Sequence, residues 1–268
     1  MNRLCALYGV TRAGYYAWRA RSESAHSEQD RSLVVAIRRI FDASNGTYGS
    51  PRVQRELLAE GSAVSRRRVE RLMRVAGLRG RVVRVYRSNP RLHQLYAQHP
   101  NRLWEFRAKR PDDVWVGDVT YLKVAKHWFY LAVVLDQFSR RVLGWSLQKM
   151  RGTQLTRAAF DPAFRRRQPR KLIFHSDRGI EYAAPGFRDR LKALGVRQSM
   201  TRGGTPGDNA HAESFFHSLK ADVVHGVEFA SDQSLRICVR RYVRYYNHRR
   251  LHSSLGYRSP VEYERQVA

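Results

Sequence analysis

The sequence predicts an α/β domain with a mixed five-stranded sheet, preceded by an all-helical region. Three observations support this fold class. Residues 1–80 carry short apolar stripes at helical spacing, separated by turn-forming residues. Residues 112–148 hold three consecutive runs rich in Val, Leu, Phe, Tyr and Trp, which is typical of antiparallel strands. After residue 150, helical and strand patterns alternate, and this predicts a sheet flanked by helices.

The helical region begins with two short helices around Gly9, and Thr11 is suited to cap the second. After a polar break, a longer helix is expected over roughly 28–43. Ser50, followed by Pro51, predicts the capped start of another helix that ends near Gly61. Ser65 predicts the cap of the next helix, whose apolar stripe is Val69, Leu72, Met73 and Ala76 and which Gly77 closes.

The last two of these helices are short and joined by a tight turn, which is typical of a helix-turn-helix DNA reader. The second of them opens on Arg66, Arg67 and Arg68. Three cations in a first helical turn oppose the helix dipole, whereas DNA phosphates would stabilise them. We therefore expect these three arginines to bind DNA. The alternative is a solvated basic face on an ordinary three-helix bundle.

Residues 81–111 are rich in Arg, show little periodicity and include three prolines, so we interpret them as a basic, partly extended linker. The core is expected to contain the three strands, a helix over 153–166, a strand over 171–177, a helix near 186–194, a short strand over 196–200 and a long helix over 209–224. A helix over 232–249 leads into the tail. The predicted domains are therefore a DNA-binding region (1–80), a linker (81–111), a catalytic core (112–226) and a helical tail (227–268).

The composition favours a polyanionic partner. Fifty Lys and Arg stand against 23 Asp and Glu, a net charge of +27, and phosphate binding by such a surface releases counterions. A merely solubilising or ribosome-like basic surface is the alternative. No run of 18 apolar residues is present and no secretory segment follows Met1, so no membrane partner is expected. The two cysteines, Cys5 and Cys238, form no disulfide framework or zinc pattern, which favours a reducing cytoplasm.

Three acidic residues point to the chemistry: Asp118 in WVGDVTY, Asp177 in HSDRGIEY and Glu213 in GDNAHAESFFHSLK, with 35 residues between the last two. Each alone could be structural, as a strand-edge, turn or helix-start carboxylate. Carboxylates that converge repel one another, and hard divalent cations such as Mg²⁺ relieve that repulsion. Two such ions about 3.5–4 Å apart can activate an attacking oxygen and stabilise a leaving oxygen at phosphorus. The hypothesis is metal-assisted phosphodiester chemistry on nucleic acid.

Helical spacing places Lys220 on the same stripe as Glu213, about 10.5 Å further along the axis. There it could grip a phosphate next to the scissile one, or else pair with Asp222 or solvent. His175 and Asn209 are expected to be structural, the latter as a helix cap. We expect three tryptophans to be packing residues rather than base-stacking platforms: Trp104, Trp128 and Trp145.

These segments together resemble the DDE transposases and integrases, above all the second-frame protein of the IS-three family of bacterial insertion sequences. The 35-residue gap and the Lys seven positions after Glu213 match that group. The tail YNHRRLHSSLGYRSP is similar to the family's Y-N-x-x-R-x-H-x-x-L-G-Y-x-x-P ending, and GTYGSPRV resembles its helix-turn-helix segment. The likeness covers nearly the whole chain. One departure is Gly117, where many relatives carry a polar residue.

The resemblance implies a ribonuclease-H-like core in which Asp118, Asp177 and Glu213 are catalytic and hold two Mg²⁺ or Mn²⁺ ions, with Asp118 bridging both. It implies a transposase: water frees a 3′-hydroxyl at the element's end, and that hydroxyl attacks another phosphodiester. The implied partners are double-stranded DNA (terminal inverted repeats and target), at least one further copy of the chain, and a first-frame protein or fusion. The implied location is the bacterial cytoplasm, at the nucleoid.

Two questions stay open at the level of sequence. Arg250, His252 and Tyr257 of the tail are DNA-binding candidates, but they could instead attach the tail to the core. The alternative functions are a helix-turn-helix regulator without catalysis, a retroviral-type integrase and a ribonuclease H. The N-terminal half lacks the His-His-Cys-Cys zinc module of the second, and the third would need neither the helix-turn-helix nor the tail motif.

Overall fold

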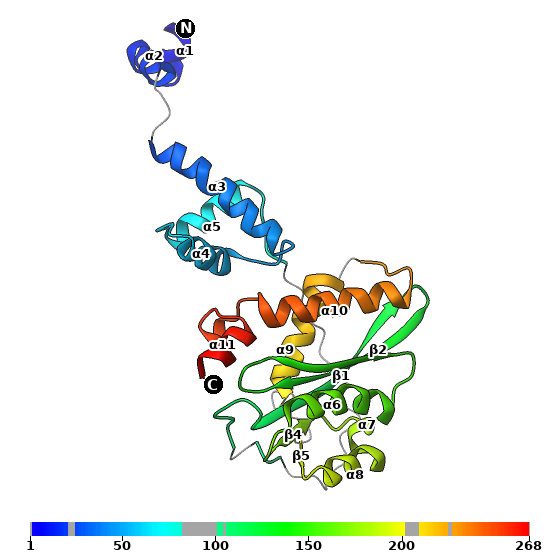
Figure 1. Cartoon of the computed structure of the whole chain (residues 1–268). Helices are drawn as coiled ribbons and strands as arrows, with labels where there is room; N and C mark the ends of the chain where they lie inside the picture. The colour runs from blue at the N-terminus through cyan, green and yellow to red at the C-terminus, as the bar shows by residue number, and fades with distance from the viewer. Residues whose placement is uncertain are drawn as a thin grey trace. The chain divides into compact units, whose positions relative to one another are not determined.

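The computed structural model describes residues 2–20, 25–81, 101–103, 106–201, 209–224 and 227–267. The chain divides into two compact units, Met1–Arg81 and Val82–Ala268 (Figure 1). Most of the predicted linker, including Trp104, lies outside the described residues. The domain limits drawn from the sequence therefore stay predictions.

The first unit is entirely helical within its described residues: α1 (Asn2–Leu7), α2 (Arg12–Ala20), α3 (Ala25–Ala43), α4 (Ser50–Ala59) and α5 (Arg66–Val75). Two predicted caps are confirmed, because Thr11 Oγ1 accepts from Gly14 N at 3.0 Å and Ser65 Oγ accepts from Arg68 N at 3.2 Å. The predicted cap at Ser50 is wrong, since Gly49 is the N-cap and Ser50 is already helical. A proline is tolerated at more than one position of a helix's first turn, because N–H groups there have no intrahelical partner. Pro51 therefore predicts the first residue of α4 only to within one position.

Helices α3, α4 and α5 pack around one small core. Its most buried members are Ile37, Val53, Leu57 and Val69, each fully buried, together with Leu72. Gly61 has φ +85°, a conformation that glycine adopts readily, and it ends α4 so that the chain turns tightly toward α5. This is the arrangement of a helix-turn-helix preceded by a supporting helix.

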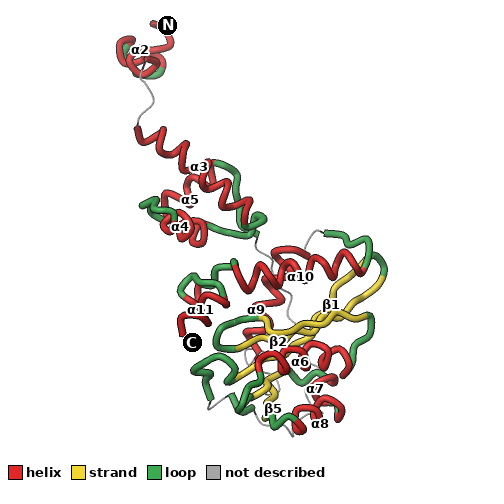
Figure 2. The backbone as a smooth tube through the Cα atoms, viewed as in Figure 1, coloured by secondary structure: helices red, strands yellow, loops and turns green. Residues whose placement is uncertain are grey.

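The second unit contains a five-stranded sheet of β1 (Val114–Val124), β2 (His127–Asp136), β3 (Val142–Gln148), β4 (Ile173–Ser176) and β5 (Arg197–Met200) (Figure 2). The strand order is β3-β2-β1-β4-β5. The first three strands are antiparallel, and β4 runs parallel to both β1 and β5. The predicted mixed five-stranded sheet is confirmed.

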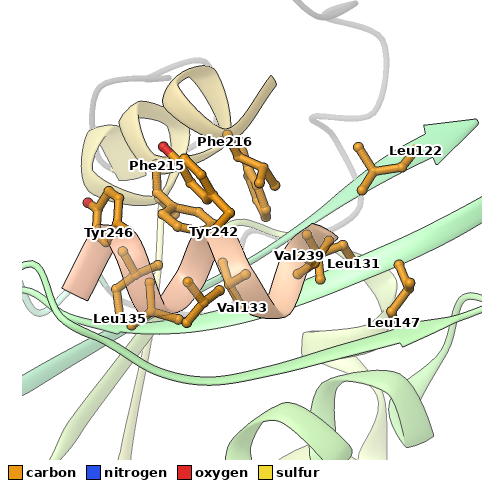
Figure 3. Close-up of a cluster of buried hydrophobic side chains, with 14 of the residues drawn as sticks. Leu122, Leu131, Val133, Leu135, Leu147, Phe215, Phe216, Val239, Tyr242 and Tyr246 are labelled. Atoms are coloured by element: carbon orange, nitrogen blue, oxygen red, sulfur yellow. The ribbon is translucent and has the colours of Figure 1, made fainter. Parts of the chain in front are cut away.

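Helices cover both faces of this sheet. One face is covered by α6 (Thr153–Arg167), α7 (Ile180–Ala183) and α8 (Pro185–Ala193), and its apolar layer includes Trp115, Phe160 and Phe174. The other face is covered by α9 (Ala210–Leu219) and α10 (Asp232–His248). Figure 3 shows this second layer, with Phe215, Tyr242 and Tyr246 of the helices facing Leu131, Val133 and Leu135 of β2. Alternate side chains of each strand therefore enter opposite layers.

The helix predicted over 209–224 changes character within its length. After α9, residues Lys220–Val224 form a wider π-helical turn, η3. In this turn Asp222 is buried and accepts hydrogen bonds from Tyr242 Oη at 2.9 Å and Arg250 Nε at 3.1 Å. These partners lie 20 and 28 residues further along the chain. The spacing of residues within the helix therefore could not predict these hydrogen bonds.

The tail continues through a 3₁₀ turn, η4 (Ser253–Leu255), to α11 (Pro260–Val267). Glu264 of α11 accepts hydrogen bonds from Ser139 Oγ at 2.8 Å and from Arg167 Nη1 at 3.2 Å, which fix the tail to the turn between β2 and β3 and to α6. Within the described ranges, no helix has the length and apolar character needed to cross a membrane.

Candidate active site

Asp118 and Asp177 are brought together by strand register. β1 pairs with β4 from Val114↔Ile173 to Gly117↔Ser176, and the two acids are the next residues of their strands. Neighbouring strands lie about 4.8 Å apart, and equivalent positions of parallel strands present side chains to the same face. The two carboxylates therefore belong to one spot, at the carboxyl end of β4, where ligand sites of open sheets form.

Glu213 approaches the same spot from α9. Asn209, which is 3% exposed, precedes the helix and donates from Nδ2 to the Gly117 carbonyl oxygen at 3.3 Å. Glu213 stands four residues later, about 6 Å along the helix axis. The predicted capping role of Asn209 is only half right: it occupies the N-cap position without a side-chain cap bond, and its amide joins α9 to β1 instead.

The three acids influence one another electrostatically. Burial, followed by the charge of Asp177, raises the pKa of Asp118 well above its usual range, and the charges of Glu213 and Glu181 add to the effect. The Val119 N–H, 2.7 Å from Asp118 Oδ1, opposes that rise in pKa. Burial also raises the pKa of Asp177, and burial with the Asp177 charge raises the pKa of Glu213. Such mutual repulsion is the condition that a bound cation relieves.

The donor set fits a hard divalent cation. Within the described ranges, no Lys or Arg forms an ion pair with Asp118, Asp177 or Glu213, so their negative charge is not cancelled by a salt bridge there. Carboxylate oxygens are the ligands that Mg²⁺ and Mn²⁺ take. In the described part of the chain, no three His, Cys, Asp or Glu side chains lie close enough together to hold a metal ion as they stand.

A fourth acid, Glu181 of α7, belongs to the same neighbourhood and was not singled out from the sequence. It is 2% exposed, and Arg151 Nε lies 3.0 and 3.1 Å from its two carboxylate oxygens. Its charge raises the pKa of both Asp118 and Asp177, whereas the charge of Arg151 lowers that of Asp177. The only sequence signal is its place in HSDRGIEY, four residues after Asp177; Arg151, 30 residues away, carries none.

Lys220 is the first residue of η3, and its position on one stripe with Glu213 stays a prediction. Burial lowers the pKa of Lys220, and the charge of Asp118 opposes that shift. The ammonium nitrogen lies 5.1 Å from the centre of the Tyr121 ring, a cation–π distance.

The predicted DNA-binding arginines of α5 differ from one another. Arg66 and Arg67 are exposed. Arg68 Nε instead donates to Asp30 Oδ1 of α3 at 2.8 Å, and its side chain is 22% exposed. Hydrogen bonds from Arg71 and Arg68 lower the pKa of Asp30. Arg68 therefore joins α5 to α3.

In the tail, two of the three candidates are turned inward. Arg250 is 7% exposed, and its Nη2 donates to Ser218 Oγ at 3.0 Å in addition to its bond to Asp222. His252 is 8% exposed, with its ring centre 4.6 Å from that of Tyr246. These contacts support attachment of the tail to the core. Tyr257 is half-buried, with φ +60°.

The structure agrees with the structural roles predicted for His175 and Trp145 but not with a core position for Trp128. His175 is fully buried with Nδ1 2.9 Å from Ser199 Oγ, in keeping with a structural role. Trp145 packs against the α9–α10 side of the sheet, as expected. Trp128 is not a core residue, since it is 49% exposed, although its ring packs against that of Tyr121.

Comparison with known proteins places this arrangement in a family. Integrase core domain models match residues 108–206 and 194–260, and an HTH-like domain model matches residues 28–86. The chain is 37% identical to the transposase InsF for insertion sequence IS3A of Escherichia coli K12, over 98% of this chain and 93% of that protein. The chain belongs to the IS3 family of insertion-sequence transposases.

A second member of the family, the transposase for insertion sequence element IS904 of Lactococcus lactis, is 32% identical over 91% of this chain and 98% of its own length. Among solved structures, the integrase-type fold recurs in a simian T-cell lymphotropic virus intasome in complex with the PP2A regulatory subunit B56 gamma. That chain matches with a TM-score of 0.50 and 15% identity, over 84% of this chain and 73% of its own. The ribonuclease-H-like core and the preceding helical domain expected for this family are thus both present.

Proposed function

We propose that this transposase cleaves and joins DNA strands at the ends of its insertion sequence by metal-dependent phosphoryl transfer. The observation that carries the proposal is the convergence of three acids from separate elements. Asp118 and Asp177 follow the last paired residues of β1 and β4, and α9 carries Glu213 from its anchor on β1. The raised pKa of each acid indicates that burial and neighbouring charges destabilise its ionised form, a cost that a bound cation would offset.

Asp118, Asp177 and Glu213 would hold the divalent ions. Bound as a pair, such ions activate an attacking oxygen and stabilise a leaving oxygen at phosphorus. The chain's own contribution is to hold Asp118 and Asp177 partly shielded from water, where their interactions with charge are stronger than in bulk solvent. Lys220 would bind a phosphate next to the reacting one.

The first unit would hold the DNA. In a helix-turn-helix the second helix enters the major groove, and in this chain that helix is α5. Arg66 and Arg67 are the exposed cations of its first turn, and Arg68 would orient the helix through Asp30. The DNA partners are the terminal inverted repeats and the target. Because two ends must be joined, we expect at least a dimer, with a first-frame protein or fusion as a further partner at the bacterial nucleoid.

Labelled element-end DNA tests the proposal directly. With Mg²⁺ or Mn²⁺ the wild type is expected to yield 3′-hydroxyl cleavage products and joined strands, and EDTA is expected to abolish both. Asp118→Asn, Asp177→Asn and Glu213→Gln should each lower the rate by on the order of a thousandfold. The exposed Asp189 of α8 offers a matched control, because Asp189→Asn removes the same charge outside the site. Full activity in all three variants would exclude the metal-site assignment, and binding without cleavage would favour a regulator.

A further inference from the structure

Two large aromatic side chains are exposed on the β1–β2 hairpin. Tyr121 is 59% exposed and Trp128 is 49% exposed. Their ring centres lie 5.2 Å apart with an interplanar angle of 83°, so the rings meet edge to face. Other large aromatics of this unit, such as Trp115 and Phe160, are fully buried. Exposed rings gathered at one place indicate a contact surface.

The surroundings of this pair are cationic. Residues 119–135 include Lys123 and Lys126 and contain no Asp or Glu. Both lysines and His127 are exposed. Lys220 reaches the same place from η3, with Nζ 5.1 Å from the Tyr121 ring centre. Aromatic rings set among cations form the kind of surface that binds single-stranded nucleic acid, since bases stack on the rings and phosphates pair with the cations.

Lys220 connects the pair to the acids. Tyr121 follows Asp118 by three residues on β1, about 10 Å along the strand, and this odd spacing starts the two side chains from opposite faces of the sheet. The β1–β4 pairing ends at Gly117, so β4 does not border this part of β1. Lys220 links the two places, because it contacts Tyr121 and experiences the charge of Asp118. With about 3.4 Å per nucleotide along one DNA strand, the separation of Tyr121 and Asp118 along β1 corresponds to roughly three nucleotides.

We propose that Tyr121 and Trp128 form a stacking site for an unpaired nucleobase of the DNA strand that enters the active site. The inference rests on the proposed function and deepens it. A base that leaves the duplex near the reacting phosphate loses its stacking partners, and the two rings replace them. Because every base has a stacking face, the site recognises unpaired DNA rather than a particular sequence. Lys220 holds a phosphate of the same strand.

The test uses the full chain and two DNA probes in EDTA, so that strand cleavage plays no part. One probe is a duplex with a 3′ overhang that carries 2-aminopurine at its first unpaired position, and the other is the same duplex fully paired. The wild type is expected to quench the 2-aminopurine fluorescence and to bind the overhang probe more tightly. Tyr121→Ala and Trp128→Ala should each weaken overhang binding by on the order of tenfold and change duplex binding little. Tyr121→Phe and Trp128→Phe, which keep a ring, should retain both properties.

Two controls separate stacking from charge and from exposed tryptophan in general. Lys123→Ala, on the same hairpin, should weaken both probes equally. Trp18→Ala removes a 67% exposed tryptophan of the first unit and should leave the quenching unchanged. No quenching by the wild type, or alanine variants with a wild-type overhang preference, would overturn the proposal. So would alanine variants that lose only self-association in sedimentation, since the pair would then be a contact between protein chains.

The outcome is independent of whether the strand-transfer proposal holds. A wild type that cleaves element ends while its alanine variants behave normally on both probes rejects the stacking site alone. A wild type that quenches the probe but cleaves no DNA with any divalent ion rejects the catalytic proposal alone.

Discussion

Arg151 holds both carboxylate oxygens of Glu181, at 3.0 and 3.1 Å from its Nε, beside the acids of the candidate active site. Glu181 is almost fully buried, whereas the Arg151 side chain is 46% exposed. Arg151 therefore neutralises the charge of Glu181, the fourth acid beside Asp118, Asp177 and Glu213, from the side that faces solvent. The charge left uncancelled is that of Asp118, Asp177 and Glu213, the three residues proposed to bind metal.

Removal of Arg151 should consequently destabilise the core. Arg151→Ala leaves the Glu181 charge buried without this partner, and we expect a loss of about 1–3 kcal/mol in the free energy of unfolding, reduced from the cost of a fully buried pair because Arg151 is half exposed. The double variant Arg151→Ala with Glu181→Gln should recover much of that loss, since no charge stays buried. Denaturant unfolding of the single and double variants measures both. Equal losses in the two would show that the Glu181 charge is not the cause.

Gly117 should tolerate no side chain. A Cβ there would collide with the Phe174 ring and lie 3.1 Å from Tyr182 Oη. Gly117→Ala is expected to lower the free energy of unfolding by about 1–3 kcal/mol and to reduce strand cleavage, because the forced shift acts on the residue next to Asp118. Gly186→Ala is a matched control, since its nearest neighbour would be 3.4 Å away. Unfolding curves and cleavage rates of the two variants test this expectation. A Gly117→Ala protein with wild-type stability and cleavage rate would show that the Phe174 ring moves aside at little cost.

Divalent ions should stabilise the second unit. An ion that binds only the folded protein adds about 2.7 kcal/mol at a concentration one hundred times its Kd. We expect Mg²⁺ to raise the melting temperature of the wild type. Asp118→Asn should melt higher than the wild type in EDTA, because it removes repulsion, and should lose the response to Mg²⁺. Calorimetry with and without the ion measures both effects, and an unchanged response in the variant would argue against Asp118 as a ligand.

Asp136 should make stability depend on pH. Burial raises its pKa to about 6 from 3.8, although the N–H groups of Ser139 and Asp112 oppose the shift. Its protonated form therefore stabilises the fold fully below about pH 4, and this contribution is lost as the pH rises through about 6. The stability of the wild type relative to Asp136→Asn should fall by up to about 3 kcal/mol between pH 4 and pH 7. Denaturant titrations across that range check it, and a constant difference would contradict the shift.

Local rules account for much of this structure. Thr11 and Ser65 cap helices because short polar side chains satisfy free N–H groups, and the strands follow from runs of β-branched and aromatic residues. The sequence also predicted that Asp118 lies within a strand and that Asp177 lies at the end of another. Contacts between distant residues did not, as with Asp30 and Arg68, 38 residues apart. The exposure of Trp128 was not predicted, because strand patterning does not reveal where the β1–β2 hairpin extends beyond the adjacent strand. Here β3 pairs with β2 only from Tyr130 onward.

Asn247 of α10 has a consequence for the solubility of the folded protein. Its side-chain amide accepts from Val142 N and donates to Val142 O, both at 2.9 Å, on the outer strand β3. At the opposite border, Arg102 Nε donates to the Gln198 carbonyl of β5 at 3.2 Å. Backbone groups at the rims of a sheet otherwise recruit strands from other molecules, which leads to aggregation. A catalytic fragment that ends before Asn247 would thus leave these backbone groups of the edge strand β3 unprotected and would be prone to aggregate. The segment that contains Asn247 therefore also protects this edge of the sheet.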